Sequence, residues 1–311
     1  QSGLPVSLSS DGSVVAIGAQ YNDGNGNNSG HVRIYQNDNG TWNQIGDDID
    51  GEAADDYSGS AQSISLSSDG SFIAIGATGN DGNGDRSGHV RIYQYANDSW
   101  TQIGNDIDGE TEGDQSGFSV SLSSDGSVVA IGAQFNDGNG ANSGHVRIYQ
   151  YANDSWTQIG NDIDGEAEQD FSGSISLSSD GSFIAIGATG NDGNGDRSGH
   201  VRIYQYANDS WTQIGADIDG EAAGDDSGYS VSLSSDGSVV AIGAYDSDAN
   251  GVRSGSVRTY QNVNGVWTQI GADIDGEAAG DLSGFSVSLS SDGTFLAVGA
   301  LFNDGNVDNS G

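Results

Sequence analysis

The sequence contains no cysteine, no methionine and no lysine, and it has a single proline, Pro5. Without cysteine there are no disulfides, which many small secreted domains require, but a chain of 311 residues can bury enough surface to do without them. The basic side chains are few: 8 of them face 45 acidic residues, which gives a net charge of −37. Such a field repels nucleic-acid backbones and anionic membrane surfaces, so we expect no nucleic-acid partner and no membrane insertion, and cations are the natural counter-charge.

Helix-forming patterns are also missing. No apolar period of 3.6 residues appears in the sequence, so we expect almost no helix. No signal peptide and no membrane-spanning run is visible, and the chain starts at Gln1 rather than at methionine. We therefore expect a processed or cut product, which is compatible with an extracellular or cell-surface location.

The dominant feature that is present is an internal repeat of about 56 residues. Residues 71–104 and 182–215 are identical, so most positions do not differ between units. A single asymmetric active site needs residues that differ, which favours a protein that is not an enzyme. The motif SLSSDG marks each unit, and its aspartates are Asp11, Asp69, Asp125, Asp180, Asp236 and Asp292.

Each unit reads as four short strands separated by turns rich in glycine, aspartate and asparagine. In the third unit these strands are expected at 118–123, 127–133, 144–151 and 155–160. The second of them is apolar or small on both faces, so it requires cover from neighbouring units on both sides. The sequence therefore predicts an all-β fold: a β-propeller of four-stranded antiparallel blades, with six blades, or seven in an intact protein. A linear β-solenoid is the alternative, but its rungs are shorter and parallel.

The predicted domain organisation is a single propeller domain over residues 1–311, with five complete repeats and a partial sixth. We expect it to be part of a longer chain. Alternatively, a six-bladed propeller carries a half blade, whose unpaired edge invites a strand from a partner and allows self-assembly.

The run SGFSVSLSSDGSVVAIGA and the later GHVRIY, within 116–149, resemble the FG-GAP repeat of integrin α-subunit propellers and of secreted microbial and algal proteins. The shared elements are the glycine before the first strand, the Asp-Gly turn, the I-G-A run and the G-x-V-R-x-Y strand. The chain departs from the family at the phenylalanine of FG and the proline of GAP. The calcium loop that the family places between its first two strands is here only S-S-D-G. The resemblance implies an extracellular propeller that serves adhesion or ligand binding.

A candidate metal site lies in the loop D-I-D-G-E-A-x-x-D, which joins the fourth strand to the next unit. Acids at alternate positions of a glycine-bent loop can wrap Ca²⁺, which takes six to eight oxygen ligands. The alternative is a solvated acidic turn. The candidate ligands are Asp48, Asp50, Glu52, Asp56, Asp106, Asp108, Glu110, Asp114, Asp162, Asp164, Glu166, Asp170, Asp217, Asp219, Glu221, Asp225, Asp273, Asp275, Glu277 and Asp281.

A second acidic loop, N-D-G-N-G, recurs between the second and third strands and favours ordinary turns, although it could add ligands. In an up-and-down blade both loops lie at the same rim. One histidine per unit begins the third strand, and we expect it to lack the clustered ligands that zinc requires. The tryptophans are expected to pack within the blades, with sugar stacking as the alternative. The strand-three arginines are expected to pair with an aspartate of a neighbouring strand or blade.

Sequons for N-glycosylation recur at the hairpin between the third and fourth strands. Such N-x-S/T sequences are also common in turns, so both interpretations stand. The candidate sites are Asn39, Asn97, Asn153 and Asn208, with Asn27 in the acidic loop.

Together these patterns predict a non-enzymatic extracellular adhesion or structural module with an acidic, Ca²⁺-binding face. Its partners would be other extracellular proteins or glycans, bound by many equal sites. A glycan-binding lectin-like propeller is the alternative. An enzyme acting on polysaccharides is a third interpretation, and it would need a carboxylate pair unique to one unit.

Overall fold

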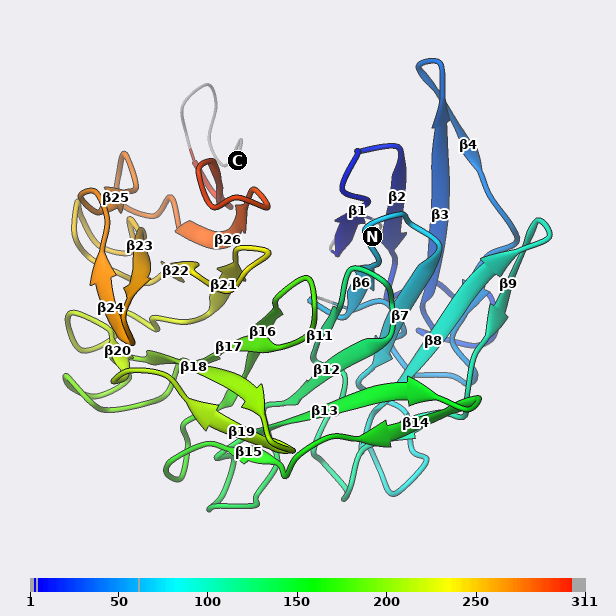
Figure 1. The fold of residues 1–311 in the computed structure, drawn as a ribbon, viewed down its shortest axis with the longest axis horizontal. Helices are drawn as coiled ribbons and strands as arrows, with labels where there is room; N and C mark the ends of the chain where they lie inside the picture. Colours follow the sequence, from blue (N-terminus) through cyan, green and yellow to red (C-terminus); the bar gives the residue numbers. More distant parts are fainter. Residues whose placement is uncertain (1–2, 4, 61, 304–311) are drawn as a thin grey trace. The chain divides into compact units, whose positions relative to one another are not determined.

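The computed structural model describes residues 3, 5–60 and 62–303, and within them every regular element is a β-strand (Figure 1). The chain divides into two compact units: residues 1–137 with 145–162, and residues 138–144 with 163–311. Over the described ranges there is no helix with the length and hydropathy needed to cross a membrane. This division by compactness does not test the prediction of a single propeller domain over residues 1–311, which stays a prediction.

The first compact unit holds three antiparallel sheets, each of which follows chain order from its first to its fourth strand. In two of these sheets a two-residue strand is added at the start of the long third strand: β5 pairs with β3, and β10 pairs with β8. The strands are β1 (Val6–Leu8), β2 (Val14–Gly18), β3 (His31–Asp38), β4 (Thr41–Gln44), β5 (Ile49–Asp50), β6 (Ile64–Leu66), β7 (Phe72–Ala77), β8 (His89–Ala96), β9 (Ser99–Gln102), β10 (Ile107–Asp108), β11 (Ser119–Leu122), β12 (Val128–Ala133), β13 (His145–Ala152) and β14 (Ser155–Gln158).

The second compact unit repeats this sheet twice, and a pair of strands follows. In both full sheets the short strand again pairs with the start of the long one. The strands are β15 (Ile163–Asp164), β16 (Ser172–Leu177), β17 (Phe183–Ala188), β18 (His200–Ala207), β19 (Ser210–Gln213), β20 (Ile218–Asp219), β21 (Ser230–Leu233), β22 (Val239–Ala244), β23 (Ser256–Val263), β24 (Val266–Gln269), β25 (Ile274–Asp275), β26 (Ser283–Leu289) and β27 (Leu296–Ala300).

The second strand lies in the core in the second to fifth sheets. All six residues of β12 are buried, and Val129 and Ala130 are 0% exposed. Alternate residues of a strand point to opposite faces, so burial of both parities means that both faces are covered. Each core cluster accordingly mixes strands of two consecutive repeats, for example Ile34 with Ile75. Burying such a side chain contributes about 1.5–3 kcal/mol, and it does so only when the next repeat is present.

The marker turn joins the first two strands. Asp125 accepts hydrogen bonds from the Ser123 hydroxyl at 2.8 Å and from the Ser127 amide at 2.9 Å. Gly126 follows with φ of +71°, a conformation that glycine adopts without a steric penalty. The S-S-D-G-S sequence thus closes the hairpin by side-chain-to-backbone hydrogen bonds.

The prediction of an all-β fold built from four-stranded antiparallel blades is confirmed. The structure adds the two-residue fifth strand, which lies inside the acidic loop and was expected to be irregular. This strand determines where the acids of the loop lie.

Candidate functional site

The short fifth strand brings each acidic loop to the histidine that begins the long strand. In the second sheet Asp108 pairs with His89, and in the fourth sheet Asp219 pairs with His200. Because the pairing is antiparallel, the first aspartate of the loop, Asp106, also lies beside the same histidine. The loop therefore packs against its own sheet and does not project freely into solvent.

The four acids of one loop have different partners. The first aspartate accepts a hydrogen bond from a glutamine of its own sheet, as Asp106 does from Gln102 at 2.6 Å. The ninth-position aspartate turns inward: Asp56 is 2% exposed and accepts the Glu52 amide at 2.9 Å. The described residues include no group of three ligand-type side chains that comes from a single loop. A Ca²⁺ site made by one loop stays a prediction.

Acids from two successive loops meet at a histidine instead. At three places a glutamate of one repeat joins a histidine and an aspartate of the next, with ligand atoms within 4.8 Å of one another. At the first, His89 Nδ1 lies 3.9 Å from Glu52 Oε2 and 3.9 Å from Asp106 Oδ2. We call these groups the junction triads: Glu52, His89 and Asp106; Glu110, His145 and Asp162; Glu166, His200 and Asp217.

The triads correct the expectation that the histidines have no clustered ligands. That expectation followed from one histidine per unit, whereas each triad takes its glutamate from the preceding repeat. A signal was present: each histidine precedes the first aspartate of its loop by the same number of positions. The glutamate is not readable in this way, because its separation from the histidine varies and only folding brings the two together.

Burial decides the protonation of the triad histidines. It lowers the pKa of His89 and of His145 to about 4, and the neighbouring arginine acts in the same direction. These imidazoles are therefore neutral near pH 7, as a metal ligand must be. Burial also raises the pKa of Glu52.

An arginine at each junction contacts one carboxylate oxygen of the glutamate and leaves the other oxygen facing the histidine. Arg91 lies 3.6 Å from Glu52 Oε1 and donates to the Asp50 carbonyl oxygen at 2.8 Å, while Glu52 Oε2 faces His89. Arg91 is 6% exposed, and its guanidinium lies 5.6 Å from the centre of the Tyr93 ring. This confirms the expected pairing with a neighbouring repeat, although the ionic partner is glutamate and aspartate contributes a backbone oxygen.

The two ends of the repeat series depart from the triad. In the fifth repeat Ser256 replaces the histidine, and Glu221 keeps only its arginine contact, with Arg258 at 3.8 Å. In the first repeat His31 lies 3.5 Å from Asp48 and 3.9 Å from Asp50, two acids of its own loop. The chain thus carries its own variants of the site.

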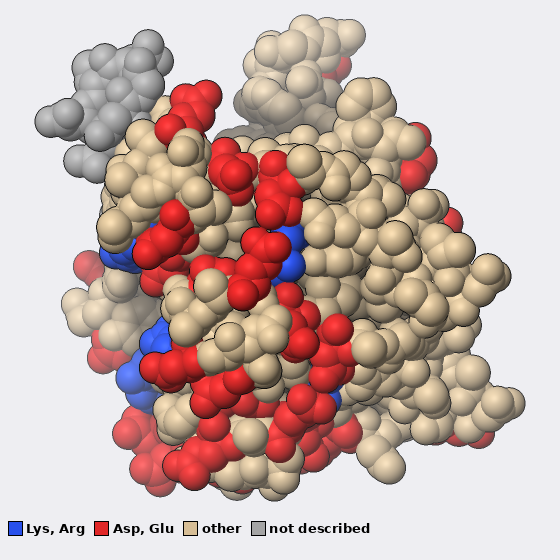
Figure 2. All heavy atoms as spheres, turned by 90° about the vertical axis from the view of Figure 1, so that its left-hand side faces the viewer, with Lys and Arg blue, Asp and Glu red and all other residues tan. Residues whose placement is uncertain are grey.

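The N-D-G-N-G loops form the expected turns and also hold the acidic loops. The Asn25 side-chain amide donates to the carbonyl oxygens of Gly51 and Glu52, both at 2.9 Å. This confirms that the two loops lie at one rim of the sheet. Figure 2 shows acidic side chains gathered on one face, with few basic atoms among them.

The remaining candidates lie elsewhere. Asn39, Asn97, Asn153 and Asn208 occupy hairpin turns with φ of +52°, and glycosylation there, or at Asn27, stays a prediction. The indole of Trp156 donates to the Ile103 carbonyl oxygen of the preceding repeat at 3.0 Å, which supports a packing role.

Comparison with known proteins supports the fold and one repeat. The FG-GAP repeat family model matches residues 107–149, so the chain contains an FG-GAP repeat. No curated protein matches the chain.

Three solved structures illustrate the structural likeness. One, from Bacteroides uniformis, is described provisionally as a 6-phosphogluconolactonase and shares 13% identity over 96% of this chain and 78% of its own, with a TM-score of 0.62. The periplasmic gluconolactonase of Pseudomonas aeruginosa shares 16% identity over 96% and 78%, with a TM-score of 0.60. The hydrazine synthase of Kuenenia stuttgartiensis shares 12% identity over 94% and 79%, with a TM-score of 0.58.

These structures correct the predicted function. The expectation of a non-enzymatic adhesion or structural module was an inference from the propeller fold and its near-identical repeats. Similar folds are found in proteins described as lactonases, so the fold points to a possible enzyme as readily as to an adhesion module. At these identities the likeness shows the fold alone, and function has to be argued from the side chains.

Proposed function

We propose that this protein is a divalent-cation-binding β-propeller with three equivalent sites, the junction triads. The supporting observation is the recurrence of one buried imidazole and two carboxylates in the same arrangement at three junctions. An imidazole nitrogen with two carboxylate oxygens is a ligand set that suits Zn²⁺ and related first-row ions.

The geometry of the triads fits such an ion. Zinc-ligand bonds are about 2.0–2.2 Å long, so the ligand atoms around one ion lie roughly 3.3–3.6 Å apart. The imidazole and glutamate atoms lie 3.8–3.9 Å apart, and all three ligand atoms lie within 4.8 Å of one another, so side-chain movements of about 1 Å would bring them around one ion. The glutamate is about half exposed, so it can move and water can complete the coordination.

The choice of ion follows from the imidazole. Ca²⁺ prefers a shell made only of oxygen ligands, whereas neutral imidazole suits Zn²⁺, Ni²⁺ and Cu²⁺. We therefore expect Zn²⁺ to bind the triads more tightly than Ca²⁺. Ca²⁺ binding by the acidic loops is a weaker, separate prediction that the same titration measures.

Such an ion would link consecutive repeats, because the glutamate belongs to one repeat and the other two ligands to the next. It would also offset part of the repulsion within a chain of net charge −37. An ion that binds only the folded state stabilises it by about 2.7 kcal/mol when its free concentration is a hundred times the dissociation constant.

The test is the number of zinc ions bound per chain. After dialysis against Zn²⁺ with excess Ca²⁺, elemental analysis should give three ions per chain, and isothermal titration should give the same stoichiometry. The triple variant His89→Ser, His145→Ser and His200→Ser should bind none. Unchanged zinc content in this variant would overturn the proposal.

The fifth repeat offers a matched control. Ser256 occupies the histidine position beside Glu221 and the Asp273 loop, so Ser256→His rebuilds the missing ligand set. This variant should bind four ions. A count that stays at three while the wild-type sites remain filled would show that the imidazole is not the deciding ligand.

A further inference from the structure

One junction differs from the others at several positions at once. Where the fourth repeat meets the fifth, Ser247 replaces an asparagine, Ser256 replaces the triad histidine, and Ala249 replaces a glycine. Asp226 and Tyr245 are also particular to this junction. In a chain whose repeats are otherwise nearly identical, differences gathered at one place mark the region where a unique site can form.

At the other junctions an asparagine side chain donates a hydrogen bond to the buried loop aspartate. The amide of Asn136 donates to Asp114 at 3.1 Å, and that of Asn303 donates to Asp281 at 3.1 Å. The aspartates are each 2% exposed. A buried carboxylate needs such donors, because an ionised group away from water is costly unless it is hydrogen-bonded.

Ser247 has no side-chain amide and is shorter than asparagine, so it does not provide this hydrogen bond to Asp225. Asp225 is 7% exposed, and its Oδ2 accepts the Ala222 amide at 3.0 Å. Within residues 3, 5–60 and 62–303, no side chain donates a hydrogen bond to Asp225. Burial raises the pKa of this carboxyl, and the backbone amides of Ala222 and Glu221 and the charge of Arg258 oppose that rise.

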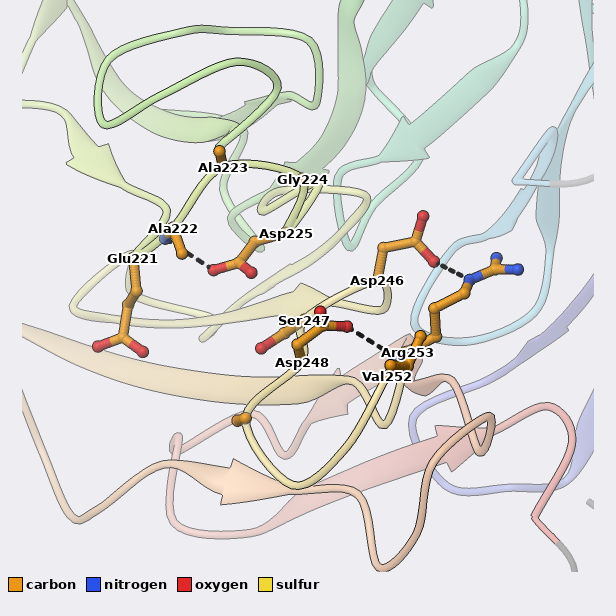
Figure 3. Close-up of a pocket in the computed structure, with 11 residues that line it drawn as sticks. Glu221, Ala222, Ala223, Gly224, Asp225, Asp246, Ser247, Asp248, Val252 and Arg253 are labelled. Atoms are coloured by element: carbon orange, nitrogen blue, oxygen red, sulfur yellow. Dashed lines mark hydrogen bonds and ion pairs between the residues drawn. The ribbon is translucent and has the colours of Figure 1, made fainter.

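A cavity of about 560 Å³ lies beside Asp225, and the short Ser247 side chain forms part of its wall. Figure 3 shows Glu221 and Asp225 on one side and Asp246, Asp248 and Arg253 on the other. This volume lies within the range of about 300–1,000 Å³ that is usual for small-molecule sites and is too large for a bare ion.

The lining of the cavity combines negative charge with a small apolar surface. Its single arginine, Arg253, is paired with Asp246, and the Arg253 backbone amide donates to Asp248 at 2.8 Å. Ala222, Ala223, Ala249 and Val252 supply the apolar part of the wall. Such a wall suits a short hydrocarbon body that carries positive charge.

A network that involves Asp226 and Tyr245, two residues that the sequence places at this junction, holds the loops around the cavity. The Arg197 guanidinium donates to Asp226 at 2.8 Å, and the Tyr245 hydroxyl donates to the same carboxylate at 3.0 Å. Tyr245 also packs on Tyr229, with ring centres 4.5 Å apart. The site is therefore built before any ligand arrives, which reduces the entropy cost of binding.

We propose that this cavity binds one small organic cation, an aliphatic primary amine whose ammonium group is held by Asp225 and Glu221 and whose carbon chain lies on Ala222 and Val252. This site is separate from the junction triads. An ammonium group supplies the donors that Asn136 supplies to Asp114 at a regular junction.

The test is a calorimetric titration with 1,4-diaminobutane, with neutral 1,4-butanediol as the matched control ligand. The metal-free protein should bind one diamine per chain and should not bind the diol. Asp225→Asn should weaken diamine binding at least tenfold, whereas Asp114→Asn at a regular junction should leave it unchanged.

A second variant guards against loss of folding. Ser247→Asn restores the residue found at the other junctions, so it should fold at least as well as wild type and should also weaken diamine binding at least tenfold. Several weak sites that both variants leave unchanged would mean diffuse attraction to an acidic surface and would overturn the proposal. Zn²⁺ or Ca²⁺ binding that displaces the diamine and is lost in Asp225→Asn would overturn it in favour of a metal site.

Discussion

Two junctions have almost the same acidic loop but give its buried aspartate different hydrogen-bond partners. One lies between the second and third repeats, and the other lies between the fourth and fifth. In the first, Asp114 receives the Thr111 amide at 2.9 Å and the Asn136 amide at 3.1 Å. In the second, Ser247 supplies no such donor, and a cavity lies beside Asp225. A single substitution in one repeat can therefore remove a hydrogen-bond partner from a buried carboxylate, and this is how we propose that a repeat fold gains a site found at one junction.

The largest expected effect comes from removing the two aspartates. Asp114→Ala removes the carboxylate that accepts from the Thr111 amide and from the buried Asn136 side chain, so we expect a loss of about 3 kcal/mol in the free energy of unfolding. Asp225→Ala removes a buried charge that no side-chain amide pairs, so we expect a smaller loss of about 1 kcal/mol or less. Urea unfolding in EDTA measures both. Equal losses would mean that the two junctions are not different in kind.

The next effect is the pH dependence that comes from the buried triad histidines, which the fourth junction lacks because Ser256 stands at that position. The pKa of His89 and of His145 is lowered to about 4 by burial, whereas an unfolded histidine titrates near 6.5. Between these values the unfolded chain binds protons that the folded chain does not. The stability that neutral histidine contributes is therefore complete above about pH 6.5 and is lost as the pH falls toward 4.

The measurement is urea unfolding between pH 6.5 and 4.5 in EDTA. Each buried histidine contributes a slope of up to about 1.4 kcal/mol per pH unit. The variant His89→Ser with His145→Ser should flatten the dependence, and Ser256→His should steepen it. Parallel curves for all three proteins would contradict the assignment of buried, neutral imidazoles.

A smaller effect compares a covered outer strand with an uncovered one. Trp156 donates to the preceding repeat at 3.0 Å, whereas Trp42 in the first repeat is 44% exposed. Trp156→Phe should lower the free energy of unfolding by about 1 kcal/mol, and Trp42→Phe should change it by less than about 0.5 kcal/mol. Urea unfolding measures both. Similar losses from both substitutions would argue that the tryptophans stabilise their own sheets.

An effect of similar size concerns the hydrogen bond between Tyr245 and Asp226 at the fourth junction. Tyr245→Phe keeps the aromatic contacts with Tyr229 and removes only the hydrogen bond to Asp226, which Arg197 still pairs. We expect a loss of about 1 kcal/mol in thermal unfolding and a shallower binding curve for the diamine. A stability change above about 3 kcal/mol would show that the hydroxyl, more than the arginine, holds the loop.

Local sequence determined the secondary structure of this protein. Alternating apolar residues and the S-S-D-G-S turns specify short hairpins, because period-two patterning and aspartate-glycine turns act over a few residues. The repeat period predicted the propeller, because the second strand is apolar on both faces and requires neighbours. The acids of the candidate site were visible for the same reason, since each loop recurs intact.

Tertiary structure alone decided which acids work together. Glu52 reaches His89 in the next repeat, and Asp56 folds back onto its own loop, although both belong to one loop. The cavity beside Asp225 is lined by Ser247, from the following repeat, where the other junctions have an asparagine. Contacts between repeats depend on how sheets pack and on which side chain faces which gap. A one-dimensional pattern shows that a residue has changed, but the packed structure shows which partner it has lost.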